Sequence, residues 1–327
     1  MKKFTIAIAL LTTAFMLLGQ DVGASTLLST EHTYFIEWTG NTDKYPGPVT
    51  VDQNGLVYAT PRSLGASYWL KLDNQLNFIS QVSNSYSGGM WGLSALTNGD
   101  ILGAYAPLHG YNYPPTIAGP HQAILLSSAY GIKDSFGGNY GSDSSTLHNP
   151  TGISSDASRN VYIADTSNNR IIKLDSNLSY VGEVAFNDPN AIDVRGNHVY
   201  ASSYDGTLLV LNLDLSDTGL GKSNAFSFGV QDIAVDSRGQ VWAGVLSGIQ
   251  LLSSDFSSTV TFSSSSLGIS GNIGGIAFDK TDHLFVTHGG GLIEFSVSQV
   301  PEAGNAVLFI IGLPLVAAFG RLRARRA

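Results

Sequence analysis

The stretch GISSDASRNVYIADTSNNRIIKLD, residues 152–175, decides how this chain is built. Two β-prone segments, NVYIA and RIIKL, enclose the polar sequence DTSNNR. A Gly-marked segment and a turn rich in Asp, Ser and Asn come before them, which is the order expected of successive antiparallel strands. Asp156, Asp165 and Arg170 are residue types that can carry chemistry. The first question is therefore whether they serve a site or a structural repeat.

The same pattern recurs along the chain. Five segments keep an offset of ten residues between the start of one strand and an apolar anchor in the next, and a sixth segment is one residue shorter. These segments are 48–58, 92–102, 152–162, 232–242 and 275–285, with 191–200 as the shorter one. Recurrence at intervals of about 40 to 50 residues is typical of repeat architectures. The polar residues of the first stretch must therefore be interpreted copy by copy.

Each copy predicts a short antiparallel sheet. A third β-prone segment follows the first two in every copy, and a weaker fourth follows in the first five. Six such units predict an all-β fold, a six-bladed β-propeller over residues 31–298. Because the sixth copy lacks a fourth strand, we expect residues 34–39 to pair beside 292–297 and close the ring. The alternative, a loose N-terminal tail, would leave four large apolar side chains exposed.

The segment HNPTGISSDASRNVYIADTSNNRIIKLD resembles an NHL repeat. The resemblance is specific in this one copy, and elsewhere only the spacing and the apolar frame persist. It implies an NHL-like propeller from about residue 45 to 298, and it suggests that Asp165 and Arg170 pair across a loop. The matching positions are Pro150, Gly152, Ile153, Asp156, Asn160, Val161, Tyr162, Ala164, Asp165, Asn168, Asn169, Arg170 and Ile171.

Alignment of the copies separates structural from variable polar residues. Asp156 aligns with Asp52, Asp236 and Asp279, so we interpret it as a turn residue whose carboxylate accepts backbone N–H groups. Asp165 aligns with unlike residues in the other copies, so the repeat itself does not require it. Pairing with Arg170 across the loop is the role we favour, and ligand binding is the alternative.

Loops at one end of a propeller are where binding residues gather. The connections after the second strand and those between blades should share one end, together with an insertion at 106–122. The insertion is either a binding loop or a decoration without function. Tyr105, Tyr111, Tyr113 and Tyr204 could stack on sugar rings or belong to the core. The candidate ligand-binding residues are Tyr111, Tyr113, His121, His148, Asp165, Arg170, Asp188, Asp205 and His288.

No motif with catalytic spacing stands out in the sequence. It lacks a nucleophile elbow, a His-Glu-x-x-His helix and a phosphate loop. We therefore expect a non-catalytic module that binds polysaccharide or protein, without an obligatory cofactor. The alternative is a Ca²⁺-dependent hydrolase or lyase, as in lactonase-like propellers that this chain resembles. Oxygen ligands for Ca²⁺ would come first from Asp188 and Asp232, with Asn190, Asn272 and His148 as further candidates.

Charge and the N-terminal segment indicate an exported protein. Between residues 25 and 300 there are 11 Lys and Arg against 23 Asp and Glu, which argues against nucleic-acid binding. Two lysines and an apolar run precede small residues up to Ala24, which predicts a signal peptide over residues 1–24. An uncleaved anchor helix is the alternative. The chain has no cysteine.

The C-terminal segment, residues 299–327, predicts a sorting signal. Val300, Pro301 and Glu302 precede an apolar run at 306–320 and a basic tail at 321–327. That order resembles the PEP-CTERM signal, which implies a membrane protease-transpeptidase of the exosortase type as partner. Ala303 stands where the family usually has proline. The resemblance implies transient membrane insertion and a final place at the cell envelope, the outer surface or a biofilm matrix. An ordinary membrane anchor is the alternative.

Overall fold

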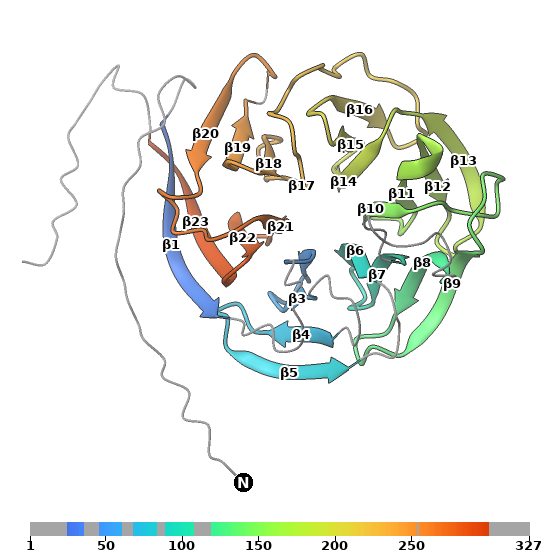
Figure 1. The fold of residues 1–327 in the computed structure, drawn as a ribbon, viewed down its shortest axis with the longest axis horizontal. Coiled ribbons are helices and arrows are strands. Elements are labelled where there is room, and N and C mark those ends of the chain that lie inside the picture. The colour runs from blue at the N-terminus through green and yellow to red at the C-terminus, as the bar shows by residue number, and fades with distance from the viewer. Residues whose placement is uncertain are drawn as a thin grey trace, which may run out of the picture.

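The computed structural model describes residues 25–35, 46–60, 68–83, 89–107, 119–253 and 255–300. In it, six antiparallel sheets stand side by side around a central axis (Figure 1). The predicted all-β, six-bladed propeller is confirmed. Apart from the 3-10 turn η1 at Thr166–Asn168, the described residues contain no helix.

Each of the first three blades contains four strands, ordered from the axis outward as they occur in the chain. Blade 1 comprises β2 (Val49–Val51), β3 (Val57–Ala59), β4 (Tyr68–Leu72) and β5 (Phe78–Ser83). Blade 2 comprises β6 (Gly89–Ala95), β7 (Ile101–Ala106), β8 (His121–Leu126) and β9 (Ile132–Gly138). Blade 3 comprises β10 (Pro150–Ser155), β11 (Val161–Asp165), β12 (Arg170–Leu174) and β13 (Tyr180–Ala185).

The other three blades differ in how their outer edge is made. Blade 4 has three strands, β14 (Pro189–Arg195), β15 (His198–Ser203) and β16 (Leu208–Asn212). Blade 5 has β17 (Asp232–Val235), β18 (Val241–Val245), β19 (Gly248–Leu252) and β20 (Thr259–Ser263). Blade 6 has β21 (Ile273–Phe278), β22 (His283–His288) and β23 (Gly291–Val300), and its fourth strand is β1 (Ser25–Phe35), from the other end of the described chain.

The sequence predicted a fourth strand in blade 4, and this prediction is wrong. Only isolated bridges, Leu208 with Lys222 and Leu211 with Asp217, lie along the outer side of β16. Gly219 has a φ of 72°, a conformation outside the extended region of strands. The segment after β16 therefore crosses the edge of the sheet without forming a ladder.

An N-terminal strand closes the ring, with Tyr34 beside Leu292 as predicted, but it begins earlier than predicted. The strand ends at Phe35 and extends toward Ser25, with Tyr34 opposite Leu292 and Leu28 opposite Val297. Residues 36–39 lie outside the described residues. A bulge at Glu31 shifts the register, so Leu28 packs between blades 5 and 6 whereas Tyr34 packs between blades 6 and 1. A bulge breaks the simple alternation by which a strand is recognised in sequence.

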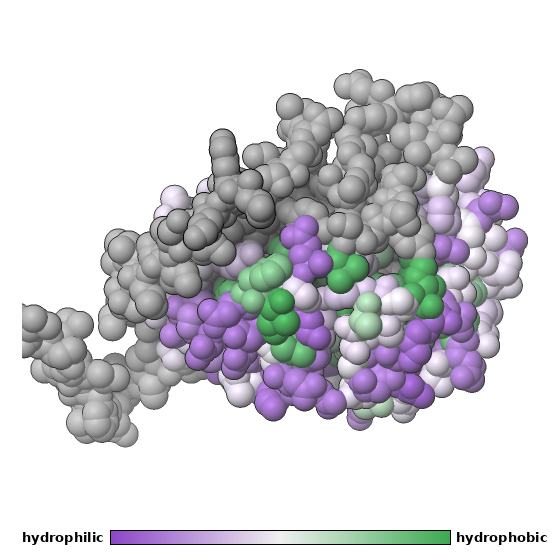
Figure 2. Space-filling view, turned by 90° about the horizontal axis from the view of Figure 1, so that it is seen from below, coloured by the Kyte–Doolittle hydropathy of each residue, from purple (hydrophilic) through white to green (hydrophobic). Residues whose placement is uncertain are grey.

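The core is divided into six apolar layers, one between each pair of neighbouring blades. The two faces of each sheet are buried against its neighbours, so both sets of alternating side chains are apolar. Outer strands form the flank of the ring. Figure 2 views the flank on the side of β5, where apolar residues lie among hydrophilic ones. Phe78 of β5 is 51% exposed.

The repeated aspartates act in turns, as predicted. The Oδ1 atom of Asp156 accepts the backbone N–H of Asn160 at 2.9 Å, and its Oδ2 accepts the hydroxyl of Tyr162 at 3.2 Å. Asp52, Asp236 and Asp279 are likewise buried and accept backbone N–H groups within their turns. The carboxylates replace backbone partners that the tight turns cannot supply.

Candidate binding face

One end of the ring collects the connections predicted to carry function. We call it the loop face, and its described segments are 139–149, 166–169, 186–188, 203–207, 223–231, 246–247, 264–272 and 289–290. Connections within and between blades touch there: the side chain of Asn149 donates to the hydroxyl of Ser167 at 2.9 Å. The backbone N–H of Ser264 donates to the carbonyl of Ser247 at 3.0 Å.

Asp165 and Arg170 form the predicted pair. The guanidinium Nε of Arg170 donates to Oδ2 of Asp165 at 2.7 Å. Asp165 is 0% exposed and Arg170 is 6% exposed. The other carboxylate oxygen accepts the backbone N–H of His148 at 2.6 Å. The two side chains face each other directly because they are opposed residues of β11 and β12.

Arg170 also holds the connection between blades 2 and 3. Its remaining four N–H groups donate to the carbonyls of Ser142, Asp143 and Thr146 and to the carboxylate of Glu183, at 2.8 to 2.9 Å. Asn168 adds a bond to the carbonyl of Gly141 at 2.7 Å. All five guanidinium donors are thus occupied. The contacts to these carbonyl oxygens hold segment 139–149 in place, and they leave no guanidinium donor of Arg170 for a ligand.

Three aromatic rings meet at this segment: Tyr140 and His148 belong to it, and His121 lies on β8. The centroids of His121 and His148 are 5.6 Å apart, and those of Tyr140 and His148 are 5.5 Å apart. Tyr140 also meets His121 edge-on at 5.9 Å. His121 is buried at the start of β8, and its Nδ1 accepts the backbone N–H of Asn149 at 2.9 Å. The structure therefore brings two of the predicted residues together around Tyr140, which is 70% exposed.

Asp188 and Asp205 lie apart from that cluster. Both are exposed. The backbone N–H of Asp188 donates to Oδ1 of Asn169 at 2.8 Å. Asp205 accepts the hydroxyl of Ser203 and the backbone N–H of Thr207, and these bonds lower the pKa of its carboxyl below the ordinary value. Asp205 is thus a turn residue in the connection after β15.

His288 lies at the end of β22 and is buried. Its Nδ1 lies 3.1 Å from the backbone nitrogen of Gly290 and 3.1 Å from the carbonyl oxygen of Ser270. Nε2 is buried without a hydrogen-bond partner. Burial lowers the pKa of the imidazole, so the neutral ring is favoured.

A second group of rings on the loop face joins Tyr204, which was a stacking candidate in the sequence, with Phe228, which was not recognised. Phe228 is 66% exposed and meets Tyr204 edge-on, with ring centroids 4.9 Å apart. The backbone N–H of Gly229 donates to the carbonyl of Tyr204 at 2.8 Å. Tyr105, by contrast, is a core residue. Tyr140 and Phe228 stand in Ser- and Gly-rich connections, and an isolated aromatic in such a segment is the only signal that could have marked them.

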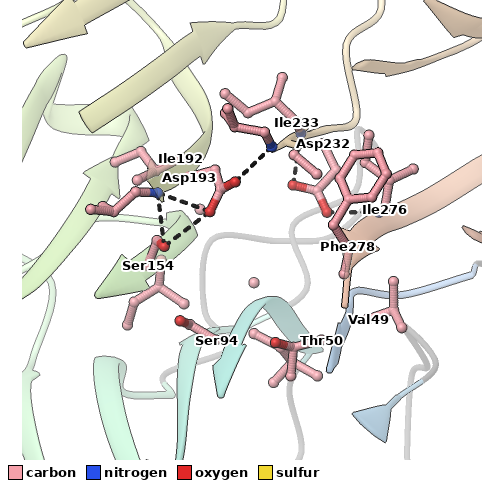
Figure 3. Close-up of a pocket in the computed structure, with 18 of the residues that line it drawn as sticks. Val49, Thr50, Ser94, Ser154, Ile192, Asp193, Asp232, Ile233, Ile276 and Phe278 are labelled. Carbon is pink, nitrogen blue, oxygen red and sulfur yellow. Dashed lines mark hydrogen bonds between the residues drawn. The ribbon is translucent and has the colours of Figure 1, made fainter. Parts of the chain in front are cut away.

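A cavity of about 190 Å³ lies on the axis, lined by the innermost strand of every blade (Figure 3). Asp193 and Asp232 both line it. Asp193 accepts the backbone N–H of Val235 at 2.7 Å, and Asp232 accepts that of Ile276 at 3.0 Å. Each carboxylate thus bonds to the next blade. Burial raises the pKa of Asp193 to about 6.

Hydroxyl groups make similar links around this axial cavity. The backbone N–H of Ala95 donates to the hydroxyl oxygen of Thr50 at 3.0 Å, and that of Val194 donates to Ser154 at 3.1 Å. The exposed edges of six inner strands leave backbone groups unpaired. Side chains at the axis therefore complete the hydrogen bonding of neighbouring blades.

The predicted calcium ligands have different surroundings. Asp188 is exposed on the connection between blades 3 and 4, and Asp232 lies at the start of β17. The side-chain nitrogen of Asn190 donates to the carbonyl of Val230 at 2.7 Å. Within the described ranges, no three His, Cys, Asp or Glu side chains form a group suited to a metal ion.

Several predictions fall outside the described residues. They are the signal peptide at 1–24, the candidate residues Tyr111 and Tyr113, Pro301 and Glu302 of the sorting signal, and the apolar run at 306–320. Val300 is the last residue of β23. In the part of the chain that the structure describes, we find no helix whose length and apolar character would allow it to cross a bilayer.

Comparison with known proteins agrees with the fold. Residues 147–174 match the family model for the NHL repeat. Blade 3 contains an NHL repeat. This segment includes β10, β11 and β12, and with them the Asp165–Arg170 pair. No curated protein matches the chain.

Two solved structures illustrate the breadth of the likeness. A streptogramin B lyase structure is 13% identical, with a TM-score of 0.52, and the match covers 84% of this chain and 98% of that one. The RRP9 WD40 repeats are 9% identical, with a TM-score of 0.54, covering 83% of this chain and 100% of theirs. An enzyme and a repeat domain are both similar at these identities, so the likeness concerns the fold alone.

Proposed function

We propose that this chain is an exported, non-catalytic β-propeller that binds polysaccharide or protein at the cell envelope or in an extracellular matrix. The loop face is the binding surface. The observation that carries the proposal is the anchoring of segment 139–149, where three of the five guanidinium donors of Arg170 bind carbonyl oxygens of this exposed connection.

The physical argument concerns preorganisation. A buried ion pair contributes little net stability, because the desolvation of both charges offsets their attraction. Its effect here is positional, since it fixes the backbone beneath Tyr140 and His148. A connection already held in one conformation loses less entropy when it binds a ligand.

Binding to envelope or matrix material provides the first test. The purified protein is screened against extracellular polysaccharides and matrix proteins, with an Asn168→Ala variant that loses the bond to Gly141. We expect Asn168→Ala to weaken binding several-fold. Asn177→Ala, in the exposed turn after β12 at the other end of the ring, is the matched control and should bind like the wild type. Equal binding by both variants would remove the loop face from the proposal.

Export and sorting belong to the same proposal. The signal peptide directs the chain out of the cytoplasm, and the segment from Val300 to the C-terminus is read in the membrane by an exosortase-type enzyme. Glu302→Ala should then leave unprocessed precursor in the membrane fraction, detected by its mass. Normal processing of that variant would contradict the sorting role.

A Ca²⁺-dependent hydrolase or lyase is the second candidate. It is favoured by one observation, the carboxyl of Asp193 in the axial cavity, whose pKa is raised to about 6. Lactone and ester substrates are tested with and without Ca²⁺. Metal-dependent turnover that is lost in Asp193→Asn or Asp232→Asn would replace the binding proposal with this one.

A further inference from the structure

The most exposed large apolar side chains of the described residues are Tyr140 and Phe228, at 70% and 66%. Both lie on the loop face, each in a connection that leads from one blade into the next. Exposed aromatic rings of this size are costly to leave in water, and on the flank the corresponding values are lower, as for Phe78. Two such rings at the same end of the ring call for an explanation.

Both rings are held in place from behind. Tyr140 is backed by the imidazoles of His148 and His121, and its backbone bridges to Leu147, whose side chain is fully buried. Phe228 is backed by Tyr204. The residue before it, Ser227, donates its backbone N–H to Oε1 of Gln250 at 2.7 Å. Rings fixed in this way present a flat apolar face at a low cost in conformational entropy.

The loop face that carries the two rings is polar and negatively charged. Asp143, Asp188 and Asp205 are all exposed on the loop face. The described segments of that face contain no Lys or Arg, and the five donors of Arg170, at the adjoining start of β12, are occupied within the protein. An anionic ligand would therefore meet repulsion without a compensating cation. A neutral or amine-bearing ligand would not.

We propose that Tyr140 and Phe228 are stacking subsites for the sugar rings of a neutral or amino-substituted polysaccharide. The apolar face of a pyranose ring covers the aromatic ring, and its hydroxyl or amino groups bond to the surrounding Ser, Asn and Asp side chains. This assignment rests on the proposed binding function and narrows it to one class of ligand. It also excludes acidic polysaccharides as preferred ligands.

The test uses the full-length protein and calorimetric titration with three probes: a neutral glucan hexasaccharide, a chitosan hexasaccharide and an oligogalacturonate. Tyr140→Ala and Phe228→Ala are compared with Tyr180→Ala and Phe78→Ala, matched substitutions on the outer strands β13 and β5. Thermal unfolding verifies that each variant is folded. We expect the two loop-face variants to bind the neutral or amino probe about tenfold more weakly, and the two controls to bind like the wild type.

Three results would overturn the inference. The first is wild-type affinity in folded Tyr140→Ala and Phe228→Ala; the second is a preference for the oligogalacturonate; the third is no binding of any probe. The Asn168→Ala variant separates this failure from that of the proposed function. If Asn168→Ala weakens binding of a matrix polysaccharide or protein while the aromatic variants do not, the loop face binds through other groups. If neither change matters, both proposals fall.

Discussion

Blades 3 and 6 use the same strand positions for different buried polar groups. At the loop-face end, blade 3 places Asp165 opposite Arg170, whereas blade 6 places His288 opposite Gly291. In the middle of the sheet each blade has a charged residue, and the two charges are of opposite sign. Lys173 lies opposite Tyr162 in blade 3, and Glu294 lies opposite Phe285 in blade 6.

Glu294 is the buried charge of blade 6, with 1% exposure. Its Oε2 lies 2.5 Å from Nδ1 of His32 on β1, and its Oε1 lies 2.8 Å from Nδ1 of His283 on β22. One carboxylate therefore connects three strands, including the N-terminal strand that closes the ring.

In each blade the buried charge lies beside the segment that it holds in place. In blade 3 the charge lies at the end of the sheet and orders a connection on the loop face. In blade 6 it lies within the sheet and joins the closing strand to its neighbour. A guanidinium stays charged at all accessible pH values, whereas imidazole and carboxyl groups titrate. The raised pKa of Glu294 and the lowered pKa of His288 predict that the stability of blade 6 depends on pH.

Replacing Arg170 should have the largest effect. Arg170→Met leaves the carboxylate of Asp165 buried without a counter-charge, which should lower the free energy of unfolding by about 3–5 kcal/mol. Lys173→Met, three residues along the same strand, is the control; it loses the hydrogen bond to the carbonyl of Leu213 and should cost about 1 kcal/mol. Urea unfolding measures both. Equal losses would show that Asp165 does not depend on Arg170.

Replacing the turn aspartate should lower the free energy of unfolding by less than Arg170→Met does, and by the same amount in blades 3 and 6. Asp156→Ala and Asp279→Ala each leave backbone N–H groups of a buried turn unpaired, a loss of about 1–2 kcal/mol in the free energy of unfolding. Binding of any loop-face ligand should not change, because both turns lie at the opposite end of the ring. Loss of binding by a folded Asp156→Ala variant would contradict its structural role.

Glu294→Gln should change how the stability of the protein depends on pH. Burial raises the pKa of Glu294 despite the opposing effect of His32 and His283, so its stabilising contribution is present below pH 4.5 and is lost as pH rises through the raised pKa. Asp279 and Asp73 lie near the two imidazoles as further charges. Glu294→Gln should therefore gain stability relative to the wild type, by about 1 kcal/mol, between pH 4 and pH 7. Parallel curves of Tm against pH would contradict this.

His288 should give the smallest effect, with the opposite sign. Its lowered pKa means that its contribution is present above pH 6.5 and is lost as pH falls through the folded-state pKa. Between pH 7 and pH 5 the free energy of unfolding of the wild type should fall relative to that of His288→Gln, by less than about 1 kcal/mol. The fall is measured as a lower Tm.

Much of the fold could be predicted because the same local chemistry is repeated. Strand alternation and turn residues near Asp52, Asp156, Asp236 and Asp279 recur at a fixed offset, and both act over a few neighbouring residues. The pairing of Asp165 with Arg170 was also predictable, since it joins opposed residues of one hairpin. The bulge at Glu31 was not, because its register is set by the core on both faces of the last sheet.

The candidate site was predicted only in part. Sequence placed His121 and His148 on one face, yet Tyr140 joins them through contacts between strand β8 and the connection 139–149. Phe228 was missed because its exposure depends on what fails to cover it, and no local pattern records that. Asp193 was not singled out in the sequence, and it lies on the axis and bonds to the next blade.

The sequence by itself determined six repeated sheets, a structural role for the turn aspartates and an acidic body. Those features follow from interactions within about ten residues, where chain connectivity limits the possible partners. Only the tertiary structure decided which strand closes the ring, which carbonyls occupy Arg170 and which rings remain exposed on the loop face. These depend on groups that lie farther apart in the chain, in neighbouring blades or at the two ends of the ring, and meet only in the folded protein.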